Sequence, residues 1–191
     1  MNIPFLKKWL KNPLQMGTIK PSSKALTELM LSQVPENAEI IVEFGAGTGP
    51  ITVALDQKFP HSQIFSFELD EELAEKVRQI APHVKVYSKN VIEAPQVLPS
   101  DVIGKVDVIL SSLPLLNIPE KVNGQILNTA FQILRPHAAF VQFTYLPFLP
   151  PVRIYKELNL WAQFIGVEFN NLPPGFVWSF RRISDAQSQK K

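Results

Sequence analysis

The chain has 191 residues, of which 46% are hydrophobic and 19% charged, and this composition indicates one globular domain with a sizeable core. The formal net charge of +2 gives no strong field for nucleic acid, and the absence of cysteine excludes disulfides, thiolate metal sites and a cysteine nucleophile. No apolar run reaches the roughly 18 residues of a membrane-spanning helix. We expect no signal peptide, because the lysine-containing N-terminus lacks a long apolar segment with a small-residue cleavage site.

The N-terminal residues 1–37 are expected to form a helical cap segment ahead of a main domain at 38–185. A helix over residues 3–13 would place Phe5, Leu6, Trp9 and Leu10 on one face and Lys7, Lys8 and Lys11 opposite them. Such a basic amphipathic helix is typical of attachment to a membrane surface, although the apolar side chains could instead pack onto the domain. All charged residues up to position 24 are lysines, which favours attachment to an anionic leaflet.

From residue 39 onward, apolar runs alternate with amphipathic segments. Strands are predicted at 39–44, 63–68, 84–88, 106–111 and 138–145, and helices at about 50–58, 70–80 and 118–134. A closing hairpin is predicted over 162–169 and 176–183, around the turn NNLPPG. The pattern predicts an α/β fold with a mostly parallel, Rossmann-like sheet, helices on both faces and an antiparallel strand from the C-terminal hairpin.

The first predicted strand leads into the turn VEFGAGTGP, in which Gly45, Gly47 and Gly49 alternate with small residues. A glycine-rich turn from strand to helix lets the backbone approach a ligand closely and presents helix N–H groups. A dinucleotide fingerprint would need glycine at Pro50, so the pattern that begins at Glu43 is a different one. It resembles motif I of class I S-adenosylmethionine-dependent methyltransferases, in which the turn faces the amino-acid half of the cofactor.

Three more strand ends match such a cofactor site. Glu68 ends the second strand, where a carboxylate can accept hydrogen bonds from both ribose hydroxyls. Asn90 follows the third strand, where the family places a polar residue beside the adenine amine. Ser111 ends the fourth strand and is expected to contact the cofactor as well.

The segment SSLPLL after the fourth strand resembles motif IV of methyltransferases. Enzymes of this class that methylate adenine or other planar amines usually have Asn or Asp at the position of Ser112 and an aromatic residue at that of Leu115. Both groups that would handle a base are missing here. This argues against a flipped nucleobase, which needs hydrogen bonds to its edge and stacking on its face.

Five segments together extend the resemblance over residues 13–182. They are MGTIKPSSKALTELM, EFGAGTG, SSLPLL, QFTYLPFLPP and NNLPPGFVWSFRR. In combination they resemble the bacterial phospholipid N-methyltransferase family and, more distantly, the rRNA adenine dimethyltransferases; Ala46 stands where the family often has proline. The resemblance implies S-adenosylmethionine as cofactor and stepwise methylation of phosphatidylethanolamine toward phosphatidylcholine. It also implies a cytoplasmic protein that is peripherally associated with the inner face of the membrane.

The resemblance also implies roles for individual residues. Thr18, Ser22 and Ser23 would help to close over the methionine end of the cofactor, and Tyr145 would lie near the reacting methyl group together with Ser112. Alternatives remain, because Ser22 and Ser23 could cap a helix that begins near position 24 and Tyr145 could be a half-buried aromatic residue at a strand end.

The amine substrate must lose a proton before it can attack a methyl group. The three histidines, His61, His83 and His137, all precede strands, which places them at the amino edge of the sheet, opposite the cofactor. We therefore expect no histidine base; Tyr145 and carbonyls of the SSLP loop would orient the amine while water takes the proton. Lys20 and Arg153 are the candidates for the lipid phosphate, ahead of Arg181 and Arg182.

Three alternatives to a phospholipid N-methyltransferase remain open. They are an enzyme like the rRNA adenine dimethyltransferases, a small-amine methyltransferase, and a cofactor-binding or lipid-surface protein without catalysis. We expect a monomer that binds an anionic membrane surface and neither metal nor nucleic acid.

Overall fold

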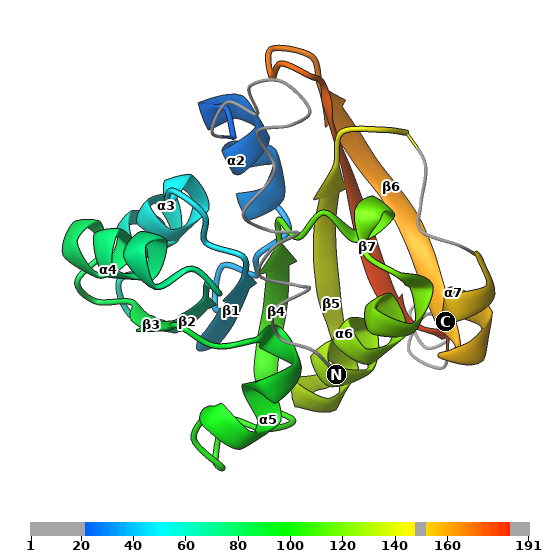
Figure 1. The fold of residues 1–191 in the computed structure, drawn as a ribbon, viewed down its shortest axis with the longest axis horizontal. Coiled ribbons are helices and arrows are strands. Elements are labelled where there is room, and N and C mark those ends of the chain that lie inside the picture. The colour runs from blue at the N-terminus through cyan, green and yellow to red at the C-terminus, as the bar shows by residue number, and fades with distance from the viewer. Residues whose placement is uncertain (1–21, 148–151, 184–191) are drawn as a thin grey trace.

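The computed structural model describes residues 22–147 and 152–183, with Val152 and Arg153 described as backbone alone (Figure 1). The expectations for the membrane helix and for part of the cofactor and phosphate sites therefore lie outside the described residues. They concern Phe5, Lys7, Lys8, Trp9, Lys11, Thr18 and Lys20, and the side chain of Arg153.

One seven-stranded sheet with the order β3-β2-β1-β4-β5-β7-β6 forms the centre of the protein (Figure 1). Its strands are β1 (Ile40–Phe44), β2 (Gln63–Phe67), β3 (Lys85–Tyr87), β4 (Val106–Ser111), β5 (Leu134–Thr144), β6 (Leu160–Glu168) and β7 (Gly175–Arg182). The first five strands are parallel; β7 pairs antiparallel with β5, and β6 pairs antiparallel with β7. The mostly parallel α/β fold with an antiparallel C-terminal hairpin is confirmed.

Helices cover both faces of the sheet. On one face lie α2 (Lys24–Leu31), α3 (Pro50–Lys58) and α4 (Glu71–Ile80). On the other lie η2 (Val91–Glu93), α5 (Ala94–Val97), η3 (Leu115–Asn117), α6 (Glu120–Ile133) and α7 (Val152–Glu157). Each layer has its own apolar core, because the central strands are buried on both sides, as a parallel sheet requires.

The local sequence explains where these elements begin. All residues of β1 and β4 are buried, so their apolar runs IIVEF and VDVILS suit the middle of a parallel sheet. Asp70 is the N-cap of α4, because its side chain accepts hydrogen bonds from the backbone N–H groups of Glu72 and Leu73.

One boundary in the C-terminal half differs from the sequence prediction. β5 begins at Leu134 rather than near residue 138, since Leu134 is already extended as the C-cap of α6, and the register with β4 shifts between Val106 and Val108. Within this irregular start His137 has a φ of 67°. In the hairpin the later strand, β7, pairs with β5, and β6 forms the edge of the sheet.

Candidate active site

The carboxyl ends of β1, β2 and β4 meet at one edge of the sheet. Phe44 at the end of β1 pairs with Phe67 of β2 and with Ser111 of β4. From β1 the sheet runs toward β3 in one direction and toward β5 in the other, so the boundary between β1 and β4 is the switch point of the topology. Ligands of open α/β sheets bind in the crevice outside such a point.

The glycine turn has left-handed backbone at each of its three glycines, with φ of 86° at Gly45, 56° at Gly47 and 90° at Gly49. At Gly49 the left-handed φ itself favours glycine, and an added Cβ atom would also lie 2.9 Å from the Cδ1 atom of Ile80 on α4. A Cβ atom on Gly47 would meet no atom of residues 22–147 or 152–183 within 4 Å. The turn thus presents backbone to open space at Gly47, which fits a ligand lying close to it.

Glu68 lies beside this open space with its carboxylate held by the backbone. One oxygen, Oε2, accepts a hydrogen bond of 2.8 Å from the N–H of Gly47, and Oε1 accepts one of 2.9 Å from the N–H of Asp70. A carboxylate oxygen can accept more than one hydrogen bond, so both retain capacity for a hydroxyl donor. This arrangement fits the pair of ribose hydroxyls that the sequence predicted for Glu68.

Glu43 lies beneath the turn and is fully buried. Its Oε2 accepts hydrogen bonds of 2.6 Å from the hydroxyls of Thr52 and Ser66, which joins β1 to α3 and β2. Its Oε1 has no partner among the described residues. Burial, with a smaller contribution from the charge of Glu68, raises the pKa of Glu43 to about 7, although the hydrogen bonds from Ser66 and Thr52 lower it. Direct contact of Glu43 with the cofactor stays a prediction.

The SSLP loop is tied to the glycine turn by Ser112, whose N–H donates to the carbonyl of Phe44 at 3.0 Å. The hydroxyl of Ser112 donates to the carbonyl of Gly45. Ser111 is fully buried, and its hydroxyl accepts a hydrogen bond of 3.4 Å from Leu113 N–H. In this state both hydroxyls support the loop, so their contact with cofactor or substrate stays a prediction.

Two buried carboxamides that the sequence analysis missed hold the same loop. Gln142 on β5 donates from Nε2 to the carbonyl of Leu113 at 2.8 Å, and Asn123 on α6 donates from Nδ2 to the carbonyl of Leu115 at 2.7 Å. The Oε1 atom of Gln142 and the Oδ1 atom of Asn123 have no partner in the described part of the chain. A polar residue inside the apolar run AAFVQFTY was the signal that could have found Gln142.

Tyr145 follows β5 at the same edge and is half-buried. Its ring packs edge-on against Phe143, with centroids 5.3 Å apart. Burial raises the pKa of Tyr145 above its usual value of 10, so the phenol stays protonated at neutral pH. The position suits either interpretation that the sequence left open, a substrate contact or a strand-end aromatic.

The polar candidates on the neighbouring elements act as helix caps in the structure. Ser23 is the N-cap of α2, because its hydroxyl accepts a hydrogen bond of 3.2 Å from the N–H of Leu26. Asn90 is the N-cap of η2 and accepts from the N–H of Ile92 at 3.0 Å. Ser22 lines a hollow of about 360 Å³ between α2 and α3. Their roles at the cofactor stay predictions.

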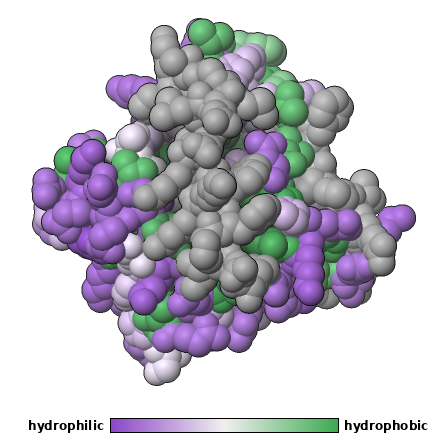
Figure 2. Space-filling view, viewed as in Figure 1, coloured by the Kyte–Doolittle hydropathy of each residue, from purple (hydrophilic) through white to green (hydrophobic). Residues whose placement is uncertain are grey.

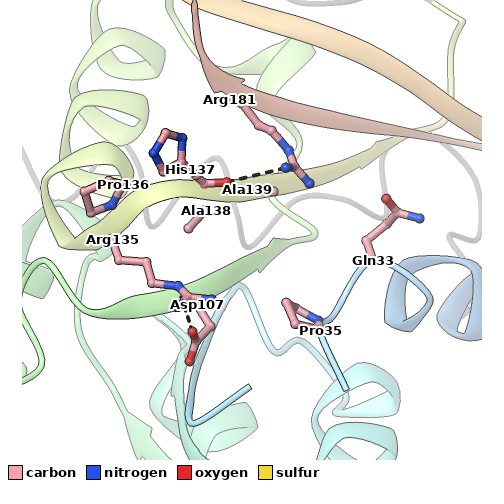
Figure 3. A pocket seen from close by; sticks show the side chains of 9 residues that line it. All are labelled: Gln33, Pro35, Asp107, Arg135, Pro136, His137, Ala138, Ala139 and Arg181. Atoms are coloured by element: carbon pink, nitrogen blue, oxygen red, sulfur yellow. Dashed lines mark hydrogen bonds and ion pairs between the residues drawn. The ribbon is translucent and has the colours of Figure 1, made fainter. Parts of the chain in front are cut away.

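A second hollow of about 360 Å³ lies at the opposite, amino edge of the sheet (Figure 3). There one oxygen of the buried Asp107 forms an ion pair with Nε of Arg135 at 2.9 Å, and the other oxygen accepts hydrogen bonds from the N–H groups of Glu39 and Ile40, both at 2.8 Å. Arg181 points toward the carbonyl of His137. Three protein groups engage this carboxylate and tie it to the start of β1, which indicates a structural role.

The three histidines lie away from the glycine turn, as the sequence predicted. His61 precedes β2, His83 precedes β3 and His137 lies at the start of β5, so all three are at the amino edge. Within residues 22–147 and 152–183, no group of three or more His, Asp or Glu residues could hold a metal ion. No helix in the same ranges is long and apolar enough to cross a membrane.

Comparison with known proteins found relatives in sequence and in structure. The chain is 29% identical over 187 residues to an ornithine lipid N-methyltransferase from Singulisphaera acidiphila, which covers 95% of this chain and 96% of that protein. No protein-family model matches the chain.

Solved structures of similar fold include methyltransferases. A TehB-like S-adenosylmethionine-dependent methyltransferase from Corynebacterium glutamicum matches 94% of this chain and 96% of its own, with a TM-score of 0.63 and 15% identity. A 1,6-didemethyltoxoflavin-N1-methyltransferase from Burkholderia thailandensis, solved with bound S-adenosylhomocysteine, matches 94% of this chain and 85% of its own, with a TM-score of 0.64 and 13% identity. The expected class I methyltransferase fold is confirmed, and the sequence similarity bears out a methyltransferase.

Proposed function

We propose that this methyltransferase transfers methyl groups from S-adenosylmethionine to the amine of a membrane lipid headgroup. S-adenosylmethionine is the methyl donor of this class, and two of the solved neighbours carry it or its demethylated product. A lipid amine as acceptor is supported by the similarity to an ornithine lipid N-methyltransferase over nearly the whole chain. Phosphatidylethanolamine is the finer proposal, and it rests on the five segments that resemble the phospholipid N-methyltransferases.

The observation that carries the proposal is the open space beside Gly47, bordered by the fixed carboxylate of Glu68 at the switch point of the sheet. Glu68 would accept hydrogen bonds from the ribose, and the turn that begins above Glu43 would face the amino-acid half of the cofactor. Asn90 would lie beside the adenine. The cofactor supplies a methyl group that is already activated on a sulfonium, so the protein has mainly to position the amine.

The groups that would position the amine belong to the SSLP loop and to Tyr145. Gln142 and Asn123 hold the carbonyls of this loop from below, which keeps the loop in one conformation. The protonated phenol of Tyr145 can donate or accept a hydrogen bond. Since the histidines lie at the other edge, water would take the proton that the ammonium group loses.

A nucleobase acceptor is disfavoured by the position of Leu115. Its side chain is 1% exposed and belongs to the core beneath η3. Enzymes that methylate a flipped base need an exposed aromatic face for stacking. A buried leucine offers no such face. This position therefore argues against an RNA adenine methyltransferase, which would need an aromatic ring there to stack on the base.

A second acceptor, ornithine lipid, is favoured by the curated relative. Ornithine lipid and phosphatidylethanolamine both offer a primary amine at the membrane surface, but they differ in the groups around it. The N-terminal lysine-rich segment would hold the protein at an anionic inner leaflet in either case.

The test is transfer of a radiolabelled methyl group from S-adenosylmethionine to acceptors offered side by side. Vesicles of phosphatidylethanolamine and of ornithine lipid, ribosomal RNA and small soluble amines each receive the same enzyme. Label in either lipid supports lipid methylation, and the ratio of initial rates assigns the headgroup. Label in RNA or in soluble amines, with none in lipid, would refute the proposal.

A further inference from the structure

Large apolar side chains are exposed in the turn between β6 and β7 and just after β5. Phe169 is 73% exposed, Leu172 70% and Leu146 51%. We call Leu146 and residues 169–174 the apolar tip. Side chains of this size are normally buried, and a group of them on a surface marks a site of interaction.

The strand register places the apolar tip at the carboxyl edge of the sheet, beside the candidate active site. Thr144 at the end of β5 pairs with Phe176 of β7, and Gly175 of β7 pairs with Glu168 of β6. The turn therefore extends beyond the same edge that carries Tyr145. Figure 2 shows hydrophobic surface at this end of the molecule and hydrophilic surface over α4.

The apolar tip is held in place by the buried Asn171, which is 2% exposed. Its Oδ1 accepts a hydrogen bond of 2.8 Å from the N–H of Ser23, and its Nδ2 donates one of 2.6 Å to the carbonyl of Pro173. These bonds join the turn to the N-terminus of α2. The neighbouring apolar side chains are thus presented outward by a fixed turn rather than folded back onto the domain.

The distribution of charge around the apolar tip suits a lipid surface. Residues 169–180 contain no charged side chain, and the carboxylate of the preceding Glu168 accepts a hydrogen bond of 2.7 Å from the backbone N–H of Asn170. The exposed Lys24 is the first residue of α2, next to the Ser23 that is bonded to the turn. Apolar side chains with a lysine behind them match the acyl and phosphate layers of a leaflet.

The segments that connect to the apolar tip along the chain also favour a lipid surface as its partner. Ser22, the first described residue, lies next to the Ser23 that is bonded to the turn, so residues 1–21 join the described structure at the apolar tip. Those residues carry the sequence that predicts a membrane-surface helix. The segment 148–151, FLPP, follows Leu146 after one residue and is also uncharged.

We infer that the apolar tip inserts into the interface of a lipid bilayer and sets the carboxyl edge of the sheet against it. A lipid amine would then reach the loop after β4 while its acyl chains stay in the membrane. The partner is the bilayer itself, and the inference deepens the proposed function because it rests on that function for the choice of substrate.

The test measures binding of the full chain to vesicles of phosphatidylethanolamine with one third anionic phosphatidylglycerol, by flotation. The variant is Phe169→Ser with Leu172→Ser. The matched control is Trp161→Ser with Ile183→Ser. It removes two apolar side chains, 45% and 41% exposed, from the end of the same hairpin that lies opposite the apolar tip. We expect the tip variant to bind about tenfold to a hundredfold more weakly and the control to bind like the wild type. Circular dichroism checks that both variants fold.

A second measurement uses the absence of cysteine from the chain. Leu172→Cys and, separately, Trp161→Cys are labelled with a polarity-sensitive fluorophore and mixed with the same vesicles. A blue shift at position 172 and none at 161 supports insertion. Equal vesicle binding by the tip variant, the control and the wild type would overturn the inference. A blue shift at position 172 that appears without vesicles and grows with protein concentration would also overturn it. That second result would show that the apolar tip binds another copy of the chain.

Methyl transfer to dispersed short-chain phosphatidylethanolamine separates this inference from the proposed function. The tip variant should keep its activity on this substrate and lose it on vesicles. If the wild type binds vesicles through the tip but methylates no lipid, the proposed function fails and the inference stands. If it methylates lipid while the tip variant acts equally on vesicles, the inference fails and the function stands.

Discussion

The two edges of the sheet both carry acidic side chains, but these carboxylates differ in how many hydrogen-bond and ion-pair partners the protein gives them. At the amino edge, Asp107 accepts hydrogen bonds from two backbone N–H groups and forms an ion pair with Arg135, so both of its oxygens have protein partners. At the carboxyl edge, Glu43 has an oxygen without a partner among the described residues, and Glu68 borders open space at Gly47. Both edges hold a buried carboxylate, but the carboxyl edge retains capacity to bind.

This difference explains why a hollow alone does not identify a site. The hollow at the amino edge is lined by charged side chains, yet its buried carboxylate stabilises the start of β1 and its arginine is already engaged (Figure 3). A ligand is recognised by polar groups that the fold leaves available. The candidate site follows from that availability and from the switch point rather than from volume.

The largest effect should come from filling the open space at the carboxyl edge. Gly47→Arg places a long cation where the cofactor would lie, so S-adenosylmethionine affinity should fall by roughly a hundredfold or more and methyl transfer should stop. Gly104→Arg is the matched control, because Gly104 also has a positive φ, 76°, and a Cβ atom there would meet no described residue within 4 Å, but it lies near the amino edge. Isothermal titration calorimetry with the cofactor compares the two. Equal loss of affinity in both variants would contradict the assignment.

At the amino edge we expect a substitution to lower the stability of the fold and leave cofactor affinity unchanged. Asp107→Ala removes the acceptor for Glu39, Ile40 and Arg135, and the loss of a buried charged acceptor should cost about 3 kcal/mol of unfolding free energy. Cofactor affinity of the folded protein should stay unchanged. Urea unfolding measures the first quantity and calorimetry the second. An affinity loss without a stability loss would show that the comparison of the edges is wrong.

A smaller, pH-dependent effect should distinguish Glu43. The unfolded carboxyl has a pKa of 4.5 and the folded one of about 7, so between these values the folded state binds more protons. Stability should therefore fall as pH rises through this window, by roughly 2 kcal/mol between pH 5 and pH 8, and level off above it. Glu43→Gln, which keeps an acceptor for Thr52 and Ser66, should remove this part of the pH dependence. Urea unfolding across this pH range would contradict the assignment if both proteins gave the same slope.

The sequence alone predicted which residues lie at the amino edge and which at the carboxyl edge, because this depends only on the order of strands along the chain. Periodicity located the five parallel strands, and placement of a residue before or after a strand was enough to assign Glu68 to one edge and His61 to the other. It could not assign Gln142 or Asn171, because their roles depend on which carbonyl or N–H group a distant element brings within hydrogen-bond distance. Exposure of Phe169 and Leu172 was equally invisible, since a strand-like pattern does not say which apolar residues the fold leaves uncovered.

The smallest effect concerns the phenol at the carboxyl edge. Tyr145→Phe keeps the ring packed on Phe143 and removes the hydroxyl that would orient the amine, so kcat should fall about tenfold while the unfolding free energy changes little. Tyr155→Phe is the control, because the buried hydroxyl of Tyr155 has no partner in the described ranges and its ring stacks on Phe180. Steady-state methylation of vesicles separates the two. A tenfold loss in both, or in neither, would reduce Tyr145 to the half-buried strand-end aromatic that its packing also permits.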